Sequence, residues 1–231
     1  MTRVAVIGDN SSEIAKKLVG LTMRPSTKDL LTGITTDEKF DEVLIILIDG
    51  SGSMTSAVPM FGNQSKIEVA WQVFKEQLAP NMAGWAYGII RFSDSAEWLV
   101  FPQKDTRALT IQTTPRAMGL TALGKGLQMA WQWTRGHAKK ARFIVLSDGQ
   151  PNDMSKENIL GLAQGNKSIP IDTVGIGQGS FDYNPEFLRS LSRITGGMFS
   201  EPNNVTLLAN TIKELSPAVR PLLGLVEGGT K

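Results

Sequence analysis

The sequence predicts an α/β protein with a doubly wound, mostly parallel sheet that is flanked by helices. Two observations favour this fold class. Apolar runs at residues 43–48 and 143–146 are short and end in turn residues, which is typical of strands that are buried on both faces of a parallel sheet. From residue 41 onward, strand patterns alternate with segments in which apolar residues recur at helical spacing.

The individual elements follow from the spacing of the apolar residues. Strands are expected at residues 43–48, 87–92, 98–101, 143–146 and 171–176. The polar residues Ser93, Asp94 and Ser95 lie between the second strand and the third, so we expect these two strands to form a hairpin or an edge pair. Helices are expected at residues 67–79, 123–134, 159–164, 188–194 and 205–215. Pro80 ends the first helix, and Pro217 prevents extension of the last.

Three parts are expected along the chain. Residues 1–40 form an N-terminal segment, in which a short strand and a helix precede a linker rich in Thr, Lys and Asp. Residues 41–216 form the main α/β domain, and residues 217–231 form a C-terminal tail.

Charge and composition argue against several kinds of partner. The net charge is +2, from 24 basic and 22 acidic side chains, so no basic surface points to nucleic acid or to an acidic membrane. Cysteine is absent from the sequence, which excludes disulfides and thiolate chemistry. No apolar run reaches the length of a signal-peptide core or of a membrane span. We therefore expect a cytoplasmic protein with no nucleic-acid or membrane partner.

Oxygen-bearing side chains gather after the two main strands and before one helix. They are Asp49, Ser51, Ser53, Thr121 and Asp148. Because ligands of open α/β sheets bind at the carboxyl ends of the strands, we expect both acids at an exposed end of the sheet, close together. Carboxylates and hydroxyls without Cys or a nearby His select a hard cation, with Mg²⁺ first and Mn²⁺ second. Since Mg²⁺ requires six ligands, part of its shell is left to water or to a partner.

The same residues carry a resemblance to a known family. An Asp-x-Ser-x-Ser sequence after the first strand, a Thr in a distant loop and an Asp after a later strand resemble the metal-ion-dependent adhesion site (MIDAS) of von Willebrand factor type A (VWA) domains. All five positions match, and further similarity extends the resemblance over about residues 41–216. The resemblance implies a Rossmann-like fold.

The resemblance also implies how such a site works. In this family the two Ser contact the metal directly, the Thr does so in the ligand-bound state, and the Asp residues act directly or through water. An Asp or Glu of a protein partner fills the open position. We therefore expect an intracellular, metal-dependent protein-binding module that is not an enzyme. An AAA+ ATPase or a kinase is the kind of partner that the resemblance suggests.

Two other functions stay open at this level. A metal-dependent hydrolase could use Asp49 or Asp148 as a base, with Asp94 and Asp153 as the only further acids. His137 is expected in a solvated loop, a strand's length from the acids, so the common nucleophilic mechanisms lack a base. The third function is that of a structural subunit in a larger assembly, where the site only holds loops together.

Overall fold

The structure is a computed structural model that describes residues 39–59, 62–82, 85–104, 114–148, 150–177 and 183–216. These residues belong to one unit that begins at Lys39. The predicted N-terminal segment, apart from its last two residues, and the predicted C-terminal tail lie outside the described residues.

Six strands form one sheet in the order β3-β2-β1-β4-β5-β6. Their bounds are Phe40–Asp49 for β1, Ala86–Phe92 for β2, Ala96–Gln103 for β3, Ala138–Ser147 for β4, Ile171–Gly175 for β5 and Phe199–Ser200 for β6. Neighbouring strands are parallel except for β2 and β3, which pair antiparallel as the short connection predicted. The predicted fold class, a mostly parallel sheet between helices, is confirmed.

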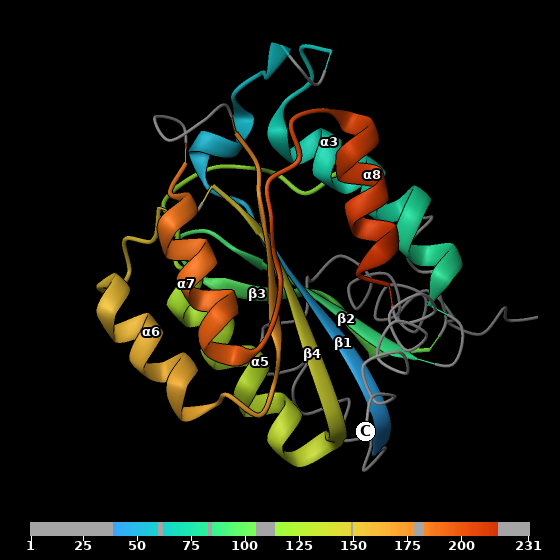
Figure 1. The fold of residues 1–231 in the computed structure, drawn as a ribbon, viewed down its shortest axis with the longest axis vertical. Helices are drawn as coiled ribbons and strands as arrows, with labels where there is room; N and C mark the ends of the chain where they lie inside the picture. Colours follow the sequence, from blue (N-terminus) through green and yellow to red (C-terminus); the bar gives the residue numbers. More distant parts are fainter. Residues whose placement is uncertain are drawn as a thin grey trace, which may run out of the picture. The chain divides into compact units, whose positions relative to one another are not determined.

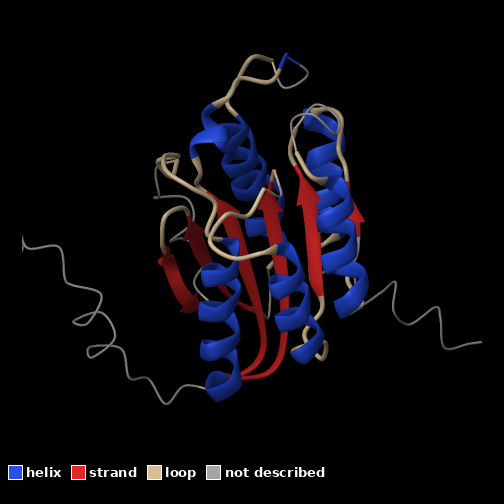
Figure 2. Ribbon diagram, turned by 90° about the vertical axis from the view of Figure 1, so that its left-hand side faces the viewer, coloured by secondary structure: helices blue, strands red, loops and turns tan. Residues whose placement is uncertain are grey.

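Helices cover both faces of this sheet (Figures 1 and 2). Their bounds are Lys66–Val73 for α3, Leu123–His137 for α5, Lys156–Gly165 for α6, Pro185–Thr195 for α7 and Val205–Glu214 for α8. Apolar residues of α5, α6 and α7 pack against one face, and those of α3 and α8 pack against the other. None of the helices in the described part of the chain has the length and apolar character that a membrane crossing needs.

Strand β1 lies at the centre and contributes side chains to both cores. Leu44, Ile46 and Ile48 face one core, while the alternate residues 43, 45 and 47 face the other. All six side chains are fully buried. Because both faces of β1 are covered, its sequence is an unbroken apolar run and does not alternate with polar residues.

Two elements differ from the expectation. The helix that we expected to run to Pro80 is α-helical only to Val73. A π turn over Phe74–Leu78 and a 3₁₀ turn over Ala79–Asn81 follow, and the helical run ends one residue after Pro80. The two-residue strand β6 was not expected, since so short a segment leaves no sequence period to detect.

The expected position of His137 in a solvated loop is wrong. His137 is the last residue of α5, and its ring stacks on Trp133 with 4.9 Å between the ring centroids. Its Nδ1 lies 2.8 Å from the carbonyl oxygen of Trp133. His137 therefore belongs to α5 and packs on Trp133, although the sequence pattern placed it in the loop after the helix.

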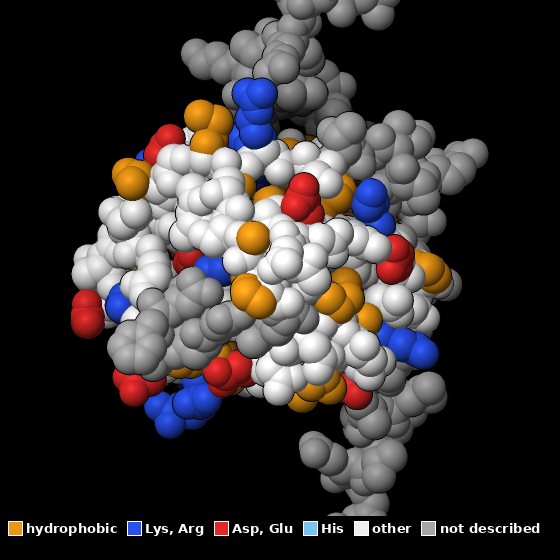
Figure 3. Space-filling view, turned by 90° about the horizontal axis from the view of Figure 1, so that it is seen from above, with side chains coloured by type: hydrophobic (Ala, Val, Ile, Leu, Met, Phe, Trp, Pro, Cys, Tyr) orange, Lys and Arg blue, Asp and Glu red, His pale blue; other side chains and the backbone are white. Residues whose placement is uncertain are grey.

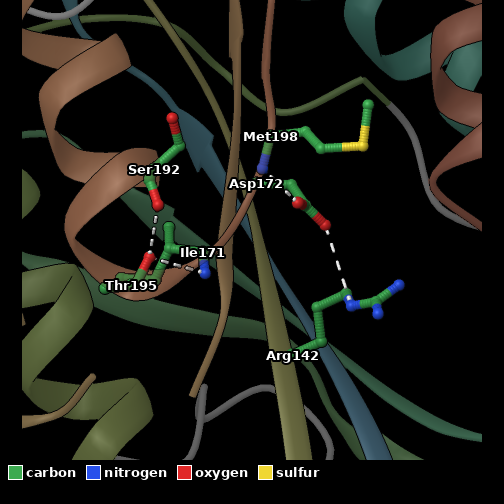
Figure 4. A network of polar contacts seen from close by, with 6 residues as sticks. All are labelled: Arg142, Ile171, Asp172, Ser192, Thr195 and Met198. Carbon is green, nitrogen blue, oxygen red and sulfur yellow. Dashed lines mark hydrogen bonds and ion pairs between the residues drawn. The ribbon is translucent and has the colours of Figure 1, made fainter. Parts of the chain in front are cut away.

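A polar network joins the strands near the start of β5 (Figure 4). Asp172 is fully buried, accepts a 2.8 Å hydrogen bond from the backbone N–H of Met198, and lies 3.8 Å from Nε of Arg142 on β4. The backbone N–H of Ile171 donates to Oγ1 of Thr195 at the end of α7. These contacts join β4, β5 and the turn that follows α7. They also give the buried polar groups the hydrogen-bond partners that such groups need.

Candidate metal centre

Four of the five predicted oxygen ligands meet at the carboxyl end of β1 and β4. The backbone N–H of Ser51 donates to Oδ1 of Asp49 at 2.8 Å, which folds the loop back over the strand end. The hydroxyls of Ser51 and Ser53 lie 2.9 Å apart, and the hydroxyl of Ser53 donates to Oδ2 of Asp148. The sequence therefore predicted correctly that residues about a hundred positions apart come together.

Thr121, the fifth residue, lies in a loop that packs against the serine loop. Its backbone N–H donates to Oδ1 of Asn152 at 2.8 Å, and the N–H of Asn152 donates back to its carbonyl at 3.1 Å. The N–H of Gly52 donates to the carbonyl of Gly119 at 2.9 Å, so the two loops are joined through their backbones. The Thr121 side chain is buried at the start of α5, where the sequence placed it.

Both acids are buried, which corrects the expectation of an exposed strand end. The exposed fraction is 0% for Asp49 and 1% for Asp148. A 3₁₀ turn over Gly52–Thr55 follows the end of β1, and its Met54 side chain is fully buried in the core. Sequence reasoning missed this turn because a single 3₁₀ turn has no apolar period of its own.

Burial changes the acidity of Asp49. Loss of solvent raises the pKa of its carboxyl to about 6, and the nearby negative charge of Asp148 acts in the same direction. Hydrogen bonds from Ser147 and Ser51 oppose the rise; the Ser147 hydroxyl donates to Oδ2 of Asp49 at 2.6 Å. Ser147 is not among the five residues that the sequence pattern predicts, although a hydroxyl beside an acid at a strand end is a signal that could have identified it.

One carboxylate oxygen in the cluster has no hydrogen-bond donor. Oδ1 of Asp148 is buried and unpartnered, and no Lys or Arg of the described residues forms an ion pair with Asp148 or Asp49. A buried acceptor without a partner is destabilising by about 1–3 kcal/mol, and more when it is charged. The oxygen is therefore suited to bind a cation.

The donor set fits a hard cation that keeps part of its water. Within the described ranges, no three residues of the types His, Cys, Asp and Glu gather where they could hold a metal ion. The cluster instead combines the carboxylates of Asp49 and Asp148 with the hydroxyls of Ser51 and Ser53. Mg²⁺ accepts such a set, because in proteins it is commonly bound by one or two carboxylates and retains several water molecules.

The other two acids near the cluster hold the backbone in place. Oδ1 of Asp94 accepts a 2.8 Å hydrogen bond from the N–H of Leu120. The carboxylate of Asp153 accepts from the N–H groups of Gly124 and Lys125, at 3.2 and 2.9 Å, and so caps the first turn of α5. Both acids therefore position the Thr121 loop and the helix that follows it.

Comparison with known proteins supports one family. Residues 44–150 match the family model of the von Willebrand factor type A domain, and this stretch contains all five predicted oxygen ligands. The solved von Willebrand factor type A structure from Catenulispora acidiphila shares the fold with a TM-score of 0.61 and 19% identity, over 78% of this chain and 43% of that chain. The comparisons support a VWA domain. VWA domains are generally protein-interaction modules.

Two further solved structures share the fold of this chain. The ArnB paralog VWA2 from Sulfolobus acidocaldarius is 24% identical with a TM-score of 0.61, over 78% of this chain and 46% of that chain. An aerotolerance-related membrane protein from Bacteroides fragilis is 19% identical with a TM-score of 0.59, over 75% of this chain and 97% of that chain. At these identities the likeness shows the fold alone, and the chain spans less than half of the Catenulispora and Sulfolobus proteins. No curated protein sequence matches the chain.

Proposed function

We propose that this VWA domain is a Mg²⁺-dependent protein-binding module of the cell interior, which holds an Asp or Glu of a partner protein at a MIDAS. The observation that carries the proposal is the buried Oδ1 of Asp148, which has no donor although it lies in a cluster of hydroxyls and a second acid. The absence of Cys from the sequence agrees with a reducing compartment.

Each residue of the cluster has a role in this proposal. The hydroxyls of Ser51 and Ser53 are direct ligands, Asp148 and Asp49 balance the charge, and Thr121 contacts the ion in the partner-bound state. Bound Mg²⁺, or Mn²⁺ in second place, supplies a positive charge that attracts the partner's carboxylate. The protein's own part is to hold these oxygens in place through Ser147 and through the reciprocal bonds between Thr121 and Asn152.

We propose binding and not turnover. Asp94 and Asp153, the further acids that a hydrolase could use, both accept backbone hydrogen bonds that shape the Thr121 loop and α5. The partner in this proposal is a protein, with an AAA+ ATPase or a kinase as the first kind to test.

Mg²⁺ is expected to stabilise the folded domain. Binding to the folded state alone adds about 2.7 kcal/mol when the free ion is at 100 times its Kd. The melting temperature of the full chain should therefore rise with Mg²⁺ or Mn²⁺ and return to its starting value with excess chelator. Scanning fluorimetry over a range of Mg²⁺ concentrations measures this, and a melting temperature that is equal in chelator and in millimolar Mg²⁺ would contradict the proposed site.

Thr121→Ala is expected to weaken partner binding more than it weakens Mg²⁺ binding, because Thr121 is the ligand assigned to the partner-bound state. Calorimetric titration with Mg²⁺ and affinity capture from lysate, in Mg²⁺ and in chelator, give the two measurements. Thr114→Ala, an exposed threonine outside the cluster, is the matched control. Ca²⁺ should replace Mg²⁺ poorly, since it prefers longer bonds and more ligands. Equal capture by Thr121→Ala and the parent chain would contradict the assigned role.

A further inference from the structure

One arginine lies against the loop that carries the two candidate serine ligands. Arg91 is the last residue but one of β2, where it pairs with Ile48 of β1. A Cβ built at Gly50 would lie 2.8 Å from Cγ and 2.9 Å from Cδ of Arg91. The apolar stem of Arg91 therefore occupies the space that a side chain at position 50 would need, and it packs on the backbone of the loop there.

The guanidinium of Arg91 reaches the other loop of the candidate metal centre. Its Nη1 donates a 2.7 Å hydrogen bond to the carbonyl of Arg116, and its Nη2 forms a 2.5 Å ion pair with Glu97 of β3. Two residues after Arg116, the N–H of Met118 donates to the carbonyl of Gly50 at 2.8 Å. A single side chain therefore contacts both loops, close to a hydrogen bond that joins them.

The backbone around Arg91 also holds both loops. The N–H of Gly50 donates to the carbonyl of Phe92 at 2.8 Å, and the N–H of Ala122 donates to the carbonyl of Ser93 at 2.7 Å. The end of β2 is therefore the part of the sheet to which the two loops are attached. Arg91 adds a side-chain link to these backbone links.

Stability alone does not explain an arginine at this position. The Nε of Arg91 is buried without a hydrogen-bond partner, and a buried donor without an acceptor is destabilising. Attraction of an anion does not explain it either, because the side chain is only 20% exposed and its charge is paired with Glu97. Figure 3 shows the face at the carboxyl ends of the strands, where basic and acidic side chains are scattered and form no single charged patch.

We propose that Arg91 is a positioning residue of the metal centre, which holds the loop at residues 50–53 and the loop at residues 116–121 at the separation that the ion needs. The proposal rests on the proposed function. Without the guanidinium, the two loops separate in part of the metal-free molecules. The apparent Kd of Mg²⁺ then rises by the inverse of the fraction of molecules that keep the loops together.

The test compares the full chain with its Arg91→Met variant. Methionine keeps an unbranched stem beside Gly50 and removes all three nitrogens, including the unpartnered Nε. The Kd of Mg²⁺ in calorimetric titration is expected to rise about tenfold, at the lower end of the effects of residues that support metal ligands. In chelator, the amide of Met118 should exchange its hydrogen several-fold faster in NMR measurements, while the melting temperature changes little.

The matched control is Arg135→Met. Arg135 is exposed near the end of α5, and its Nη2 donates to Oδ1 of Asn166 at 3.0 Å, so this variant also loses an arginine hydrogen bond between two segments. It should keep the parent's Kd of Mg²⁺ and the parent's exchange rate at Met118. If Arg91→Met does not fold, Arg91→Lys replaces it with the same expected directions, since lysine has one nitrogen in place of the planar fork.

An unchanged Kd of Mg²⁺ or an unchanged exchange rate at Met118 in the Arg91 variant overturns the positioning role. A Kd that rises equally in Arg135→Met also overturns it, because the effect then does not come from the two loops. If the parent chain itself does not bind Mg²⁺, the proposed metal site is wrong instead. The exchange rate at Met118 then decides alone whether Arg91 holds the two loops together, so the two failures are distinguishable.

Discussion

Gly197→Ala is expected to lower the free energy of unfolding by about 4 kcal/mol or more, at the upper end of single substitutions. A Cβ at this position would lie 1.9 Å from the carbonyl oxygen of Ile171 and 2.4 Å from its carbonyl carbon. These are backbone atoms of β5, which is held by its pairing with β4, so they cannot move aside as the end of a flexible side chain could. Denaturant unfolding followed by fluorescence or circular dichroism measures the loss.

Two other glycines provide controls for this effect. Gly161 lies in α6 with nothing within 4 Å of a built Cβ, so Gly161→Ala should stabilise the domain by about 0.5–1 kcal/mol. A Cβ built at Gly196 also has nothing within 4 Å, but the φ of Gly196 is +71°. Gly196→Ala should therefore lower the free energy of unfolding by about 1–2 kcal/mol, from the backbone conformation alone. If Gly197→Ala is as stable as Gly196→Ala, the prediction is wrong, because the backbone of β5 must then move away from the added Cβ.

Asp49→Asn is expected to have two opposite effects on stability. In chelator at pH 7.5 the free energy of unfolding should rise, by up to about 3 kcal/mol, because a buried charge beside Asp148 is removed and the pKa of Asp49 is raised by about two units. Asparagine keeps an oxygen that can accept from Ser51. In Mg²⁺ the variant should lose the stabilisation that the parent chain gains, since the ion loses one of its two balancing charges.

The pH dependence of the metal-free domain tests the same group. The carboxyl of Asp49 has a pKa of about 6 in the folded state and 3.8 as its reference value, so between these values the folded state binds more protons than the unfolded state. The stability contributed by Asp49 therefore falls as pH rises from about 4 to 6 and is constant above. Asp49→Asn should lack this part of the pH profile.

Asp94→Asn is the control for both measurements, because Asp94 is exposed and asparagine keeps the Oδ1 that accepts the hydrogen bond from the N–H of Leu120. It should keep the Mg²⁺ stabilisation of the parent chain. Retention of that stabilisation by Asp49→Asn, or a large loss of stability in chelator, would show that Asp49 has a structural role and is not a charge-balancing residue.

Much of the architecture could be predicted from local pattern. The apolar run of β1 reveals a strand buried on both faces, and the turn residues that follow β1 and β4 place the acids at one edge of the sheet. The paired ends of β1 and β4 then bring Asp49 and Asp148 into one cluster, which required no knowledge of the loops.

The details of the site depend on contacts that no local pattern contains. Ser147 orients Asp49 across two strands, and Asn152 holds Thr121 from the loop after β4. Each of these contacts joins segments that are far apart in sequence. The sequence therefore predicted which residues come together, but not the hydrogen bonds that hold them in place.

The pairing of β1 with β4 also affects folding kinetics. The hydrogen bond between Ser147 and Asp49 joins residues separated by 98 positions, and closure of so long a loop is a slow, late event in folding. Neither half of the cluster can bind an ion strongly before that closure. A cation that binds only the completed arrangement would leave the rate of folding nearly unchanged and would slow unfolding, so its benefit would be a longer lifetime of the folded state.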